Sequence, residues 1–301
     1  FNQNAVAASI ESTYGSATGD YLTLLGELFT LSSDEYKAAL DSLGGAPIAS
    51  IMQSSQHSFN LYQQAINNRL GSGGGTATRN DLSFSTKGQS SAGISADSIW
   101  VAMQYGGGSV ESDGNSSGYS FKGTSFLLGL DALTNNGLQL GVTVGTYDAG
   151  RTRFDNGDVI ENDFGYQVGI YGQYETDRFY VRGLMGHAGW DADATRTVTV
   201  GNVTGTNQSN FDVDVFNIHG ELGLNLGAKV SSFDISPYVA LDYSHSSISN
   251  LTETGVTGAA LNLSGSNDKV DATLGVRFNG RYQNGAMTIE PMFGIGVKTN
   301  L

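Results

Sequence analysis

The feature that most constrains the fold is an alternation of apolar residues with polar residues or glycine, which recurs in long segments beyond residue 98. The segment 216–229, FNIHGELGLNLGAK, is the clearest case: its even-numbered positions are mostly apolar, and its odd-numbered positions are polar or glycine. The segments 164–174 and 270–280 follow the same rule. Two is the period of a β-strand, whose successive side chains point to opposite faces. The sequence therefore predicts a sheet with one apolar face and one polar face.

The length of these segments separates two kinds of β protein. They exceed the usual strand length of about 5–6 residues. Long strands with one apolar face are typical of transmembrane β-barrels, which have lipid outside and a wet lumen inside. A soluble β-sandwich is the alternative, but it usually has more proline-bearing turns, and this chain has three prolines beside 42 glycines. We therefore predict an all-β transmembrane outer-membrane β-barrel with nine readable strands, near 99–111, 119–133, 138–154, 161–175, 178–198, 210–228, 233–250, 260–282 and 287–301.

The connections between these strands alternate in length. Four are short: TNNG (134–137), TD (176–177), KVSS (229–232) and QNGA (283–286). Four are longer and polar: ESDGNSSG (111–118), DNGDVI (155–160), GNVTGTNQS (201–209) and NLTETGVTGAA (250–260). Short turns on one rim and long loops on the other are the outer-membrane pattern, in which the short turns are periplasmic.

The first 70 residues have the pattern of helices. Apolar residues between Tyr21 and Phe29 share one helical face, and Ser32 with Glu35 forms a capping box for a second helix. The segment 47–70 predicts a third helix, rich in uncharged amides and hydroxyls, with Arg69 almost its only charge. Such a helix would be roughly 36 Å long. This composition suits a confined polar cavity, where charges are costly, although an ordinary polar surface helix stays open as an alternative.

Composition excludes several functions. The net charge is −14, which argues against nucleic acid as a partner, because nucleic acid is bound mainly through Lys and Arg. The chain has no cysteine, and its four histidines lack the spacing of metal ligands. No GxSxG motif is present, and GxGxxG-like matches fall inside strands with no helix after them. We therefore expect no metal, no cofactor and no enzymatic reaction. No segment has the length of a membrane-spanning helix or the pattern of a signal peptide.

Several blocks in a fixed order resemble a known family. A polar helix ending in AINNRLG is followed by a glycine-rich break and the strand SIWVAMQYGGG, and then by SFLLGLDALTNNGLQLGVTVGTY. The most specific block is SPYVALDYSHSSISNLTETG, which has Pro237, Leu241, Tyr243, Thr252, Glu253 and Gly255 in the family's pattern. From about residue 33 onward, the chain resembles the translocator domain of monomeric autotransporters, the proteins of type V secretion.

This resemblance implies a function in protein transport. Members of the family insert a twelve-stranded barrel into the outer membrane of a Gram-negative bacterium, with the help of the barrel-assembly machinery. They carry an N-terminal passenger to the cell surface, and a pore helix stays in the lumen. The resemblance thus implies three parts: a passenger tail or linker at 1–20, a helical segment at 21–75 with the pore helix at 47–70, and the barrel at 76–301. A diffusion porin is a weaker alternative, because a porin does not need an N-terminal helical segment of this length.

The alternation also predicts which polar side chains face the lumen. Acids and a few bases lie on the polar faces of the strands, where they can pair with one another and with Arg69 of the helix. We expect a structural network that also restricts ion flow, formed by Arg69, Asp131, His219, Glu221, Asp242, Asp271, Arg277, Glu290 and Lys298. The alternative is that some of these residues lie beyond the rim in bulk water.

Self-cleavage is a further possibility that the resemblance raises. Some relatives cut their own pore helix at an Asn-Asn bond by asparagine cyclisation, and this chain has Asn67-Asn68. In those relatives the pair lies several residues before the basic-apolar pair, whereas here it directly precedes Arg69-Leu70. We therefore expect Asn67 and Asn68 to be hydrogen-bonding residues of the helix.

The last segment, 288–301, predicts a strand that travels outward from the short QNGA turn. It would be the ninth strand, whereas a barrel of this class has an even number, because lipid cannot satisfy an open sheet edge. Family chains also finish with an aromatic residue, and this segment ends in Leu301. We therefore expect a barrel domain that lacks about three C-terminal strands. Pairing of 288–301 with 98–111 in a closed barrel would contradict this expectation.

Overall fold

The computed structural model describes residues 2–71, 82–84, 95–113, 116–133, 137–231, 233–280, 282–284, 287–289 and 292–301. Four helices come first in the chain: α1 (Asn2–Tyr14), α2 (Gly19–Leu28), α3 (Ser33–Leu43) and α4 (Ala46–Gly71). The strands are β1 (Leu82–Phe84), β2 (Ser95–Val110), β3 (Tyr119–Leu133), β4 (Leu138–Asp148), β5 (Arg151–Phe154), β6 (Val159–Asn162), β7 (Phe164–Glu175), β8 (Phe179–Val200), β9 (Val203–Leu224), β10 (Lys229–Val230), β11 (Phe233–Thr252), β12 (Asn262–Gly280), β13 (Tyr282–Asn284), β14 (Met287–Ile289) and β15 (Met292–Asn300).

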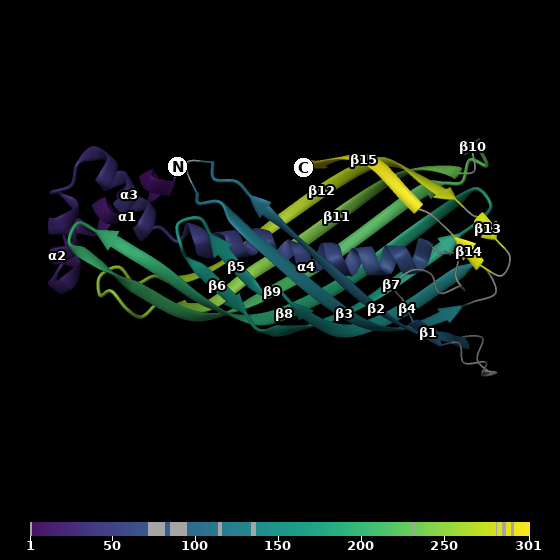
Figure 1. The fold of residues 1–301 in the computed structure, drawn as a ribbon, viewed down its shortest axis with the longest axis horizontal. Coiled ribbons are helices and arrows are strands. Elements are labelled where there is room, and N and C mark those ends of the chain that lie inside the picture. Colours follow the sequence, from purple (N-terminus) through teal and green to yellow (C-terminus); the bar gives the residue numbers. More distant parts are fainter. Residues whose placement is uncertain are drawn as a thin grey trace.

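One large antiparallel sheet forms the body of the molecule. Its strands lie in the order β1-β2-β3-β4-β7-β8-β9-β11-β12-β15, so nearly every strand pairs with its neighbours in the chain. The sheet curves around α4, while α1, α2 and α3 lie together at one end (Figure 1). The predicted arrangement of long antiparallel strands around an N-terminal helix is confirmed. In the described part of the chain, the outermost strands of the sheet are β1 and β15, and no pairing joins them.

The alternation in the sequence places side chains on the predicted faces. In β9 the odd-numbered residues from Phe211 to Gly223 are buried, and the even-numbered residues are half-buried or exposed. The outward apolar side chains are strongly exposed; Leu241, Leu274 and Val297 have 58%, 67% and 75% of their surface accessible. A face of this composition suits contact with lipid.

Several strand boundaries differ from the predictions. The segment GNVTGTNQS is not a loop, because Val200 pairs with Val203 and β9 begins there, which leaves Gly201 and Asn202 as the turn. Gly201 has φ of +55°, which suits the first position of a two-residue hairpin turn. The segment DNGDVI is a loop only in part, because β6 begins at Val159 and pairs with β5 and β8.

The structure also differs from the prediction in the last predicted strand and at the start of the sheet. The predicted strand 287–301 is divided: β14 pairs with β13 in a small separate hairpin, and only β15 joins the large sheet. The short strand β1, which pairs with β2, was not predicted. The turn residues 134–136 and 285–286 lie outside the described residues.

Cross-strand pairs of glycine and an aromatic residue fill the inner surface of the sheet. In each pair the ring folds over the glycine directly opposite: Trp100 with Gly129, Tyr171 with Gly141, Tyr180 with Gly223, and Tyr238 with Gly275. At Gly223 an added Cβ would overlap the ring of Tyr180, so the ring can lie there only because the residue has no side chain. These close approaches explain part of the high glycine content of the strands.

Gly223 and Gly220 of β9 allow a matched test of this packing. An added Cβ at Gly220 meets no atom within 4 Å. We expect Gly223→Ala to destabilise the barrel by about 1–3 kcal/mol, because the Tyr180 ring must move, and Gly220→Ala to have a much smaller effect. The measurement is the temperature at which the compact, fast-migrating form is lost on electrophoresis. Equal shifts for the two variants would contradict the packing argument.

Candidate functional site

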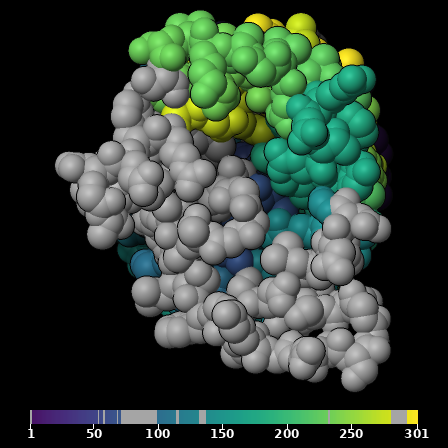
Figure 2. All heavy atoms as spheres, turned by 90° about the vertical axis from the view of Figure 1, so that its right-hand side faces the viewer, coloured from purple at the N-terminus to yellow at the C-terminus, as the bar shows by residue number. Residues whose placement is uncertain are grey.

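The candidate site is the lumen, the space inside the curved sheet, together with α4, which lies along it. α4 contacts β2, β3 and β7 on one side and β8, β9 and β11 on the other. Figure 2 looks into the molecule from one end and shows dark-blue atoms of α4 between the walls. Among the described residues, no helix is long and apolar enough to cross a membrane. The apolar side chains of α4 are nevertheless buried against the wall, among them Ile51, Leu61, Ala65, Ile66 and Leu70.

The C-terminal end of α4 is held by an ion pair. Arg69 and Asp131 of β3 are 4% and 1% exposed, and Arg69 Nε donates to Asp131 Oδ2 at 2.7 Å, with a second donor from Nη2 to the same oxygen. The Trp100 Nε1–H lies 2.7 Å from the Tyr171 hydroxyl and 3.2 Å from Asp131 Oδ1. The Tyr171 hydroxyl also donates to Asp131. These additional hydrogen bonds offset the cost of burying the two charges.

A notch in the wall receives Tyr62 from the middle of α4. Gly169 of β7 and Gly186 of β8 are cross-strand partners, and the Tyr62 ring lies against both of them. A Cβ at Gly169 would overlap the Tyr62 hydroxyl, and a Cβ at Gly186 would lie 2.9 Å from the ring. The hydroxyl lies 3.0 Å from Thr143 Oγ1 of β4, within hydrogen-bond distance. Shape and a hydrogen bond therefore both fix α4 along the lumen axis.

Gln63, the next residue of α4, lies between two polar side chains of the wall. Its Nε2 lies 2.6 Å from His219 Nδ1 and donates to Asp242 Oδ1 at 3.0 Å. His219 Nδ1 also lies 2.6 Å from the same Asp242 oxygen. Lys298 Nζ approaches the other oxygen of Asp242 at 3.3 Å and Asp271 at 3.1 Å. The helix thus reaches a chain of wall charges through an uncharged amide.

A second cluster lies within the wall. Arg277 donates to Glu221 through two nitrogens, at 2.6 and 3.0 Å. Arg182 Nη1 lies 3.9 Å from the same carboxylate, and its guanidinium stacks 4.4 Å above the ring of Tyr180. Arg277 stacks in the same way on Tyr238, at 4.8 Å. Two arginines therefore share Glu221, and aromatic faces provide additional favourable contacts for both guanidinium groups.

Most of the predicted network residues come together in these two groups of contacts. Arg69 and Asp131 form one pair, and His219, Glu221, Asp242, Asp271, Arg277 and Lys298 form a connected set. The Lys298 side chain is 46% exposed, so it is the most solvent-exposed member of this set. Glu290 lies outside the described residues. Within the described part of the chain, no three His, Asp or Glu side chains gather so that they could hold a metal ion.

The predicted set omits two buried arginines. Arg182 alternates with the outward-facing Val181 in β8, so the period of two could have identified it. Arg196, near the far end of the same strand, pairs with Glu253. Glu253 belongs to the block that carried the family resemblance, but the sequence offers no sign of which arginine it contacts.

Asn67 and Asn68 lie in the last turns of α4. Asn67 is half-buried, and within the described residues its Oδ1 is buried without a hydrogen-bond partner. The side chain of Asn68 lies outside the described part. Asp131 contacts Arg69, which follows these asparagines in the helix, and is paired with that arginine.

Comparisons with known proteins agree with this geometry. The autotransporter beta-domain family model matches residues 99–301. The translocator domain of the autotransporter NalP from Neisseria meningitidis has a similar structure: the TM-score is 0.57 at 13% identity, with 84% of this chain and 78% of that chain covered. An uncharacterized protein from the trpE-trpG intergenic region of Pseudomonas putida is 26% identical over 172 residues, which are 55% of this chain. The match spans 26% of that relative's length. The chain therefore belongs to the autotransporter beta-domain family and is a translocator domain of the Gram-negative outer membrane.

Proposed function

We propose that this domain anchors and exports an N-terminal passenger, and that α4 remains in the lumen as a plug. The observation that carries the proposal is the fit of α4 to the wall. Arg69, Gln63 and Tyr62 each contact a different set of strands, through an ion pair, an amide contact and a notch. A helix held at several levels inside the lumen leaves little room for free diffusion, which is why a porin is the weaker candidate.

The lengths of the connections give the direction of export. Asp131, which holds the C-terminal end of α4, lies just before the short turn at 134–137. The N-terminal end of α4 lies at the opposite rim, beside the long hairpin β8–β9 (Figure 1). If the short turns are periplasmic, a passenger that precedes α4 emerges at the cell surface. Lipid would contact the outward apolar band, and the barrel-assembly machinery would insert the strands.

We also propose that the domain is not a protease. Asparagine cyclisation needs the Asn67 side-chain nitrogen to reach the Asn67 carbonyl carbon, and an acid or base to move protons. Among the predicted lumen acids that the structure describes, Asp131, Glu221 and Asp242 each have a basic partner, which makes these three carboxylates poor proton acceptors. The asparagines then serve as polar side chains of the plug.

Removal of the plug should open the pore. We expect deletion of Ala46–Gly71 to give large, long-lived conductance steps in planar bilayers, whereas the intact chain stays near the closed level. The electrophoretic shift of folded barrels serves as the control that the deletion variant has assembled. Unchanged conductance of an assembled deletion variant would show that α4 does not block the lumen.

The Tyr62 notch offers a test that leaves the plug in the chain. We expect Gly186→Ala to raise the frequency of channel openings by roughly tenfold, because a clash with Tyr62 costs about 1–3 kcal/mol. The double variant with Tyr62→Ala should remove the clash. It therefore shows whether the added openings of Gly186→Ala come from the clash with Tyr62 or from damage to the wall. Gly183→Ala, where the nearest atom lies 3.8 Å away, is the matched control in the same strand. Equal opening frequencies in Gly186→Ala and Gly183→Ala would contradict the notch.

Mass spectrometry tests the absence of cleavage. We expect the folded, membrane-extracted protein to have the intact mass of the chain, and Asn67→Ala to differ only by the substituted side chain. A fragment that begins at Asn68 and disappears in Asn67→Ala would instead establish self-cleavage.

A further inference from the structure

The three helices α1, α2 and α3 form a compact unit, here called the cap, on the long-loop rim. Its apolar side chains pack against Val198 and Val200 at the tip of β8 and against Ala259 in the loop after β11. The cap residues in this cluster are Leu24, Leu25, Leu28, Ala39 and Leu40, all no more than 3% exposed. The cap therefore packs on the barrel through a small apolar core of its own.

A buried ionic node ties the cap to two parts of the rim. Arg196, 2% exposed, donates from Nε and Nη2 to the two carboxylate oxygens of Glu253, at 2.9 and 2.6 Å. Its Nη2 also donates to the Ala259 carbonyl at 2.8 Å, and its Nη1 donates to the Ser42 carbonyl of α3. Asn207 Nδ2 donates to Glu253 at 3.0 Å. One guanidinium thus joins β8, the loop after β11 and the last turn of α3.

The charge of Glu253 is maintained by these partners. Burial alone would raise the pKa of Glu253, but the hydrogen bonds from Arg196 and Asn207 and the charge of Arg196 outweigh it, so the pKa is lower than usual. Glu253 is therefore ionised at neutral pH, and the node is a full ion pair.

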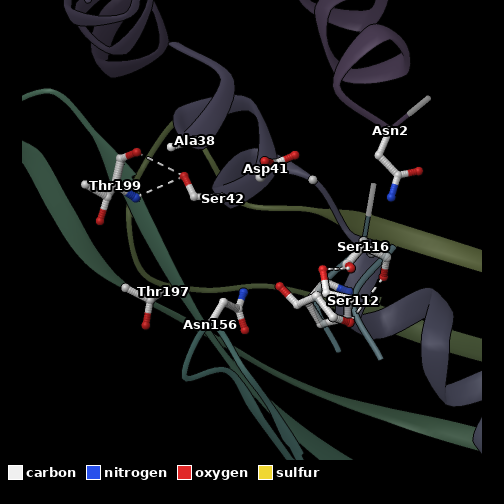
Figure 3. Close-up of a pocket in the computed structure, with 13 residues that line it drawn as sticks. Asn2, Ala38, Asp41, Ser42, Ser112, Ser116, Asn156, Thr197 and Thr199 are labelled. Carbon is white, nitrogen blue, oxygen red and sulfur yellow. Dashed lines mark hydrogen bonds between the residues drawn. The ribbon is translucent and has the colours of Figure 1, made fainter. Parts of the chain in front are cut away.

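Two further contacts fix the cap to the tip of β8. Ser42 Oγ donates to the Thr199 carbonyl at 3.0 Å, and the Thr199 amide donates to Ser42 Oγ at 3.1 Å, as Figure 3 shows. Glu27 of α2 accepts hydrogen bonds from the backbone and side-chain nitrogens of Asn202, both at 3.1 Å. The cap therefore satisfies polar groups at the exposed end of the β8–β9 hairpin.

The cap is joined to the plug by a very short link. α3 ends at Leu43 and α4 begins at Ala46, so only Gly44 and Gly45 lie between them. Gly45 packs against Leu261 and Leu263, which leaves little freedom at the link; an added Cβ would lie 3.2 and 3.1 Å from their side chains. The position of the cap therefore sets the position of the N-terminal end of α4.

Beside these contacts the interface is open to water. A cavity of about 400 Å³ lies between the cap, the start of α4 and the loop after β2, and its lining includes the side chains of Ser112, Ser116, Asn156 and Thr197 (Figure 3). Because the cap and the barrel do not pack closely at this cavity, docking of the cap depends on the apolar cluster and on the Arg196 node.

We propose that the cap is a surface-side clamp of the translocator, which stays docked on the long-loop rim through Arg196 and Glu253 and holds the outer end of the plug. This inference rests on the proposed function of α4, because a clamp needs a plug to hold. It assigns α1, α2 and α3 to the barrel's own machinery, whereas the sequence assigned residues 1–20 to a passenger tail or linker.

Trypsin gives a direct test, because the cap, residues 2–43, contains one basic residue, Lys37 in α3. Cleavage at Lys37 requires local unfolding of α3. We expect Arg196→Met to raise the rate of cleavage at Lys37 by roughly tenfold or more, because it leaves Glu253 buried and unpaired. Arg151→Met, which removes an exposed ion pair with Glu161 on the neighbouring hairpin, is the matched control and should leave the rate unchanged.

The same variants in planar bilayers connect the clamp to the plug. We expect Arg196→Met to show brief partial openings that Arg151→Met lacks. If Arg196→Met does not assemble, Glu253→Gln and a variant without residues 2–43 serve in its place, with assembly checked by the electrophoretic shift. An assembled variant whose Lys37 stays as protected as in the wild type, or a variant without the cap that shows no added openings, would overturn the clamp. Unchanged conductance after deletion of α4 would instead overturn the plug and leave the trypsin result standing.

Discussion

Lipid offers no hydrogen-bond partner to a peptide group, and this constraint governs the whole domain. Long antiparallel strands satisfy the constraint by pairing with one another, and their outward side chains are apolar because they meet hydrocarbon. The polar side chains of each strand must therefore point into the lumen. A chain with Asp131, Glu221 and Asp242 on its inner faces must therefore provide partners for them inside a narrow space.

α4 supplies part of that partnership without adding much charge. A buried charge is costly unless it is paired, whereas an amide or hydroxyl needs only a hydrogen bond. This difference explains why the helix is rich in Gln, Asn and Ser and why its one arginine meets one aspartate. The wall provides the rest through pairs of its own, such as Arg277 with Glu221. Wall and helix are complementary because the same constraint acts on both.

The sequence predicts which face of a strand a side chain lies on, because that depends on periodicity. It predicts few of the contacts between residues, because those depend on the register of the strands. The period of two identified the inner faces of β9 and β12 and hence His219, Glu221 and Arg277. Cross-strand and long-range partners have no such signal. The notch for Tyr62 exists because Gly169 and Gly186 happen to face each other, and the Arg196–Glu253 pair joins residues 57 positions apart. The cap was also missed, because helices that pack on a hairpin tip show the same amphipathic pattern as helices of any linker.

The contacts of α4 and the cap differ in what happens when they break. If Gln63 leaves Asp242, only an uncharged amide loses its partner, and Lys298 still pairs with the Asp242 carboxylate. If Arg69 leaves Asp131, or Arg196 leaves Glu253, a buried charge loses its counter-charge, and this is costly in a protein interior. The Arg69–Asp131 pair holds the C-terminal end of α4 directly. The Arg196–Glu253 pair holds the N-terminal end through the cap and the Gly44–Gly45 link. The two ends of α4 are therefore held by buried charges, whereas its middle is held by the shape of the Tyr62 notch and by uncharged hydrogen bonds.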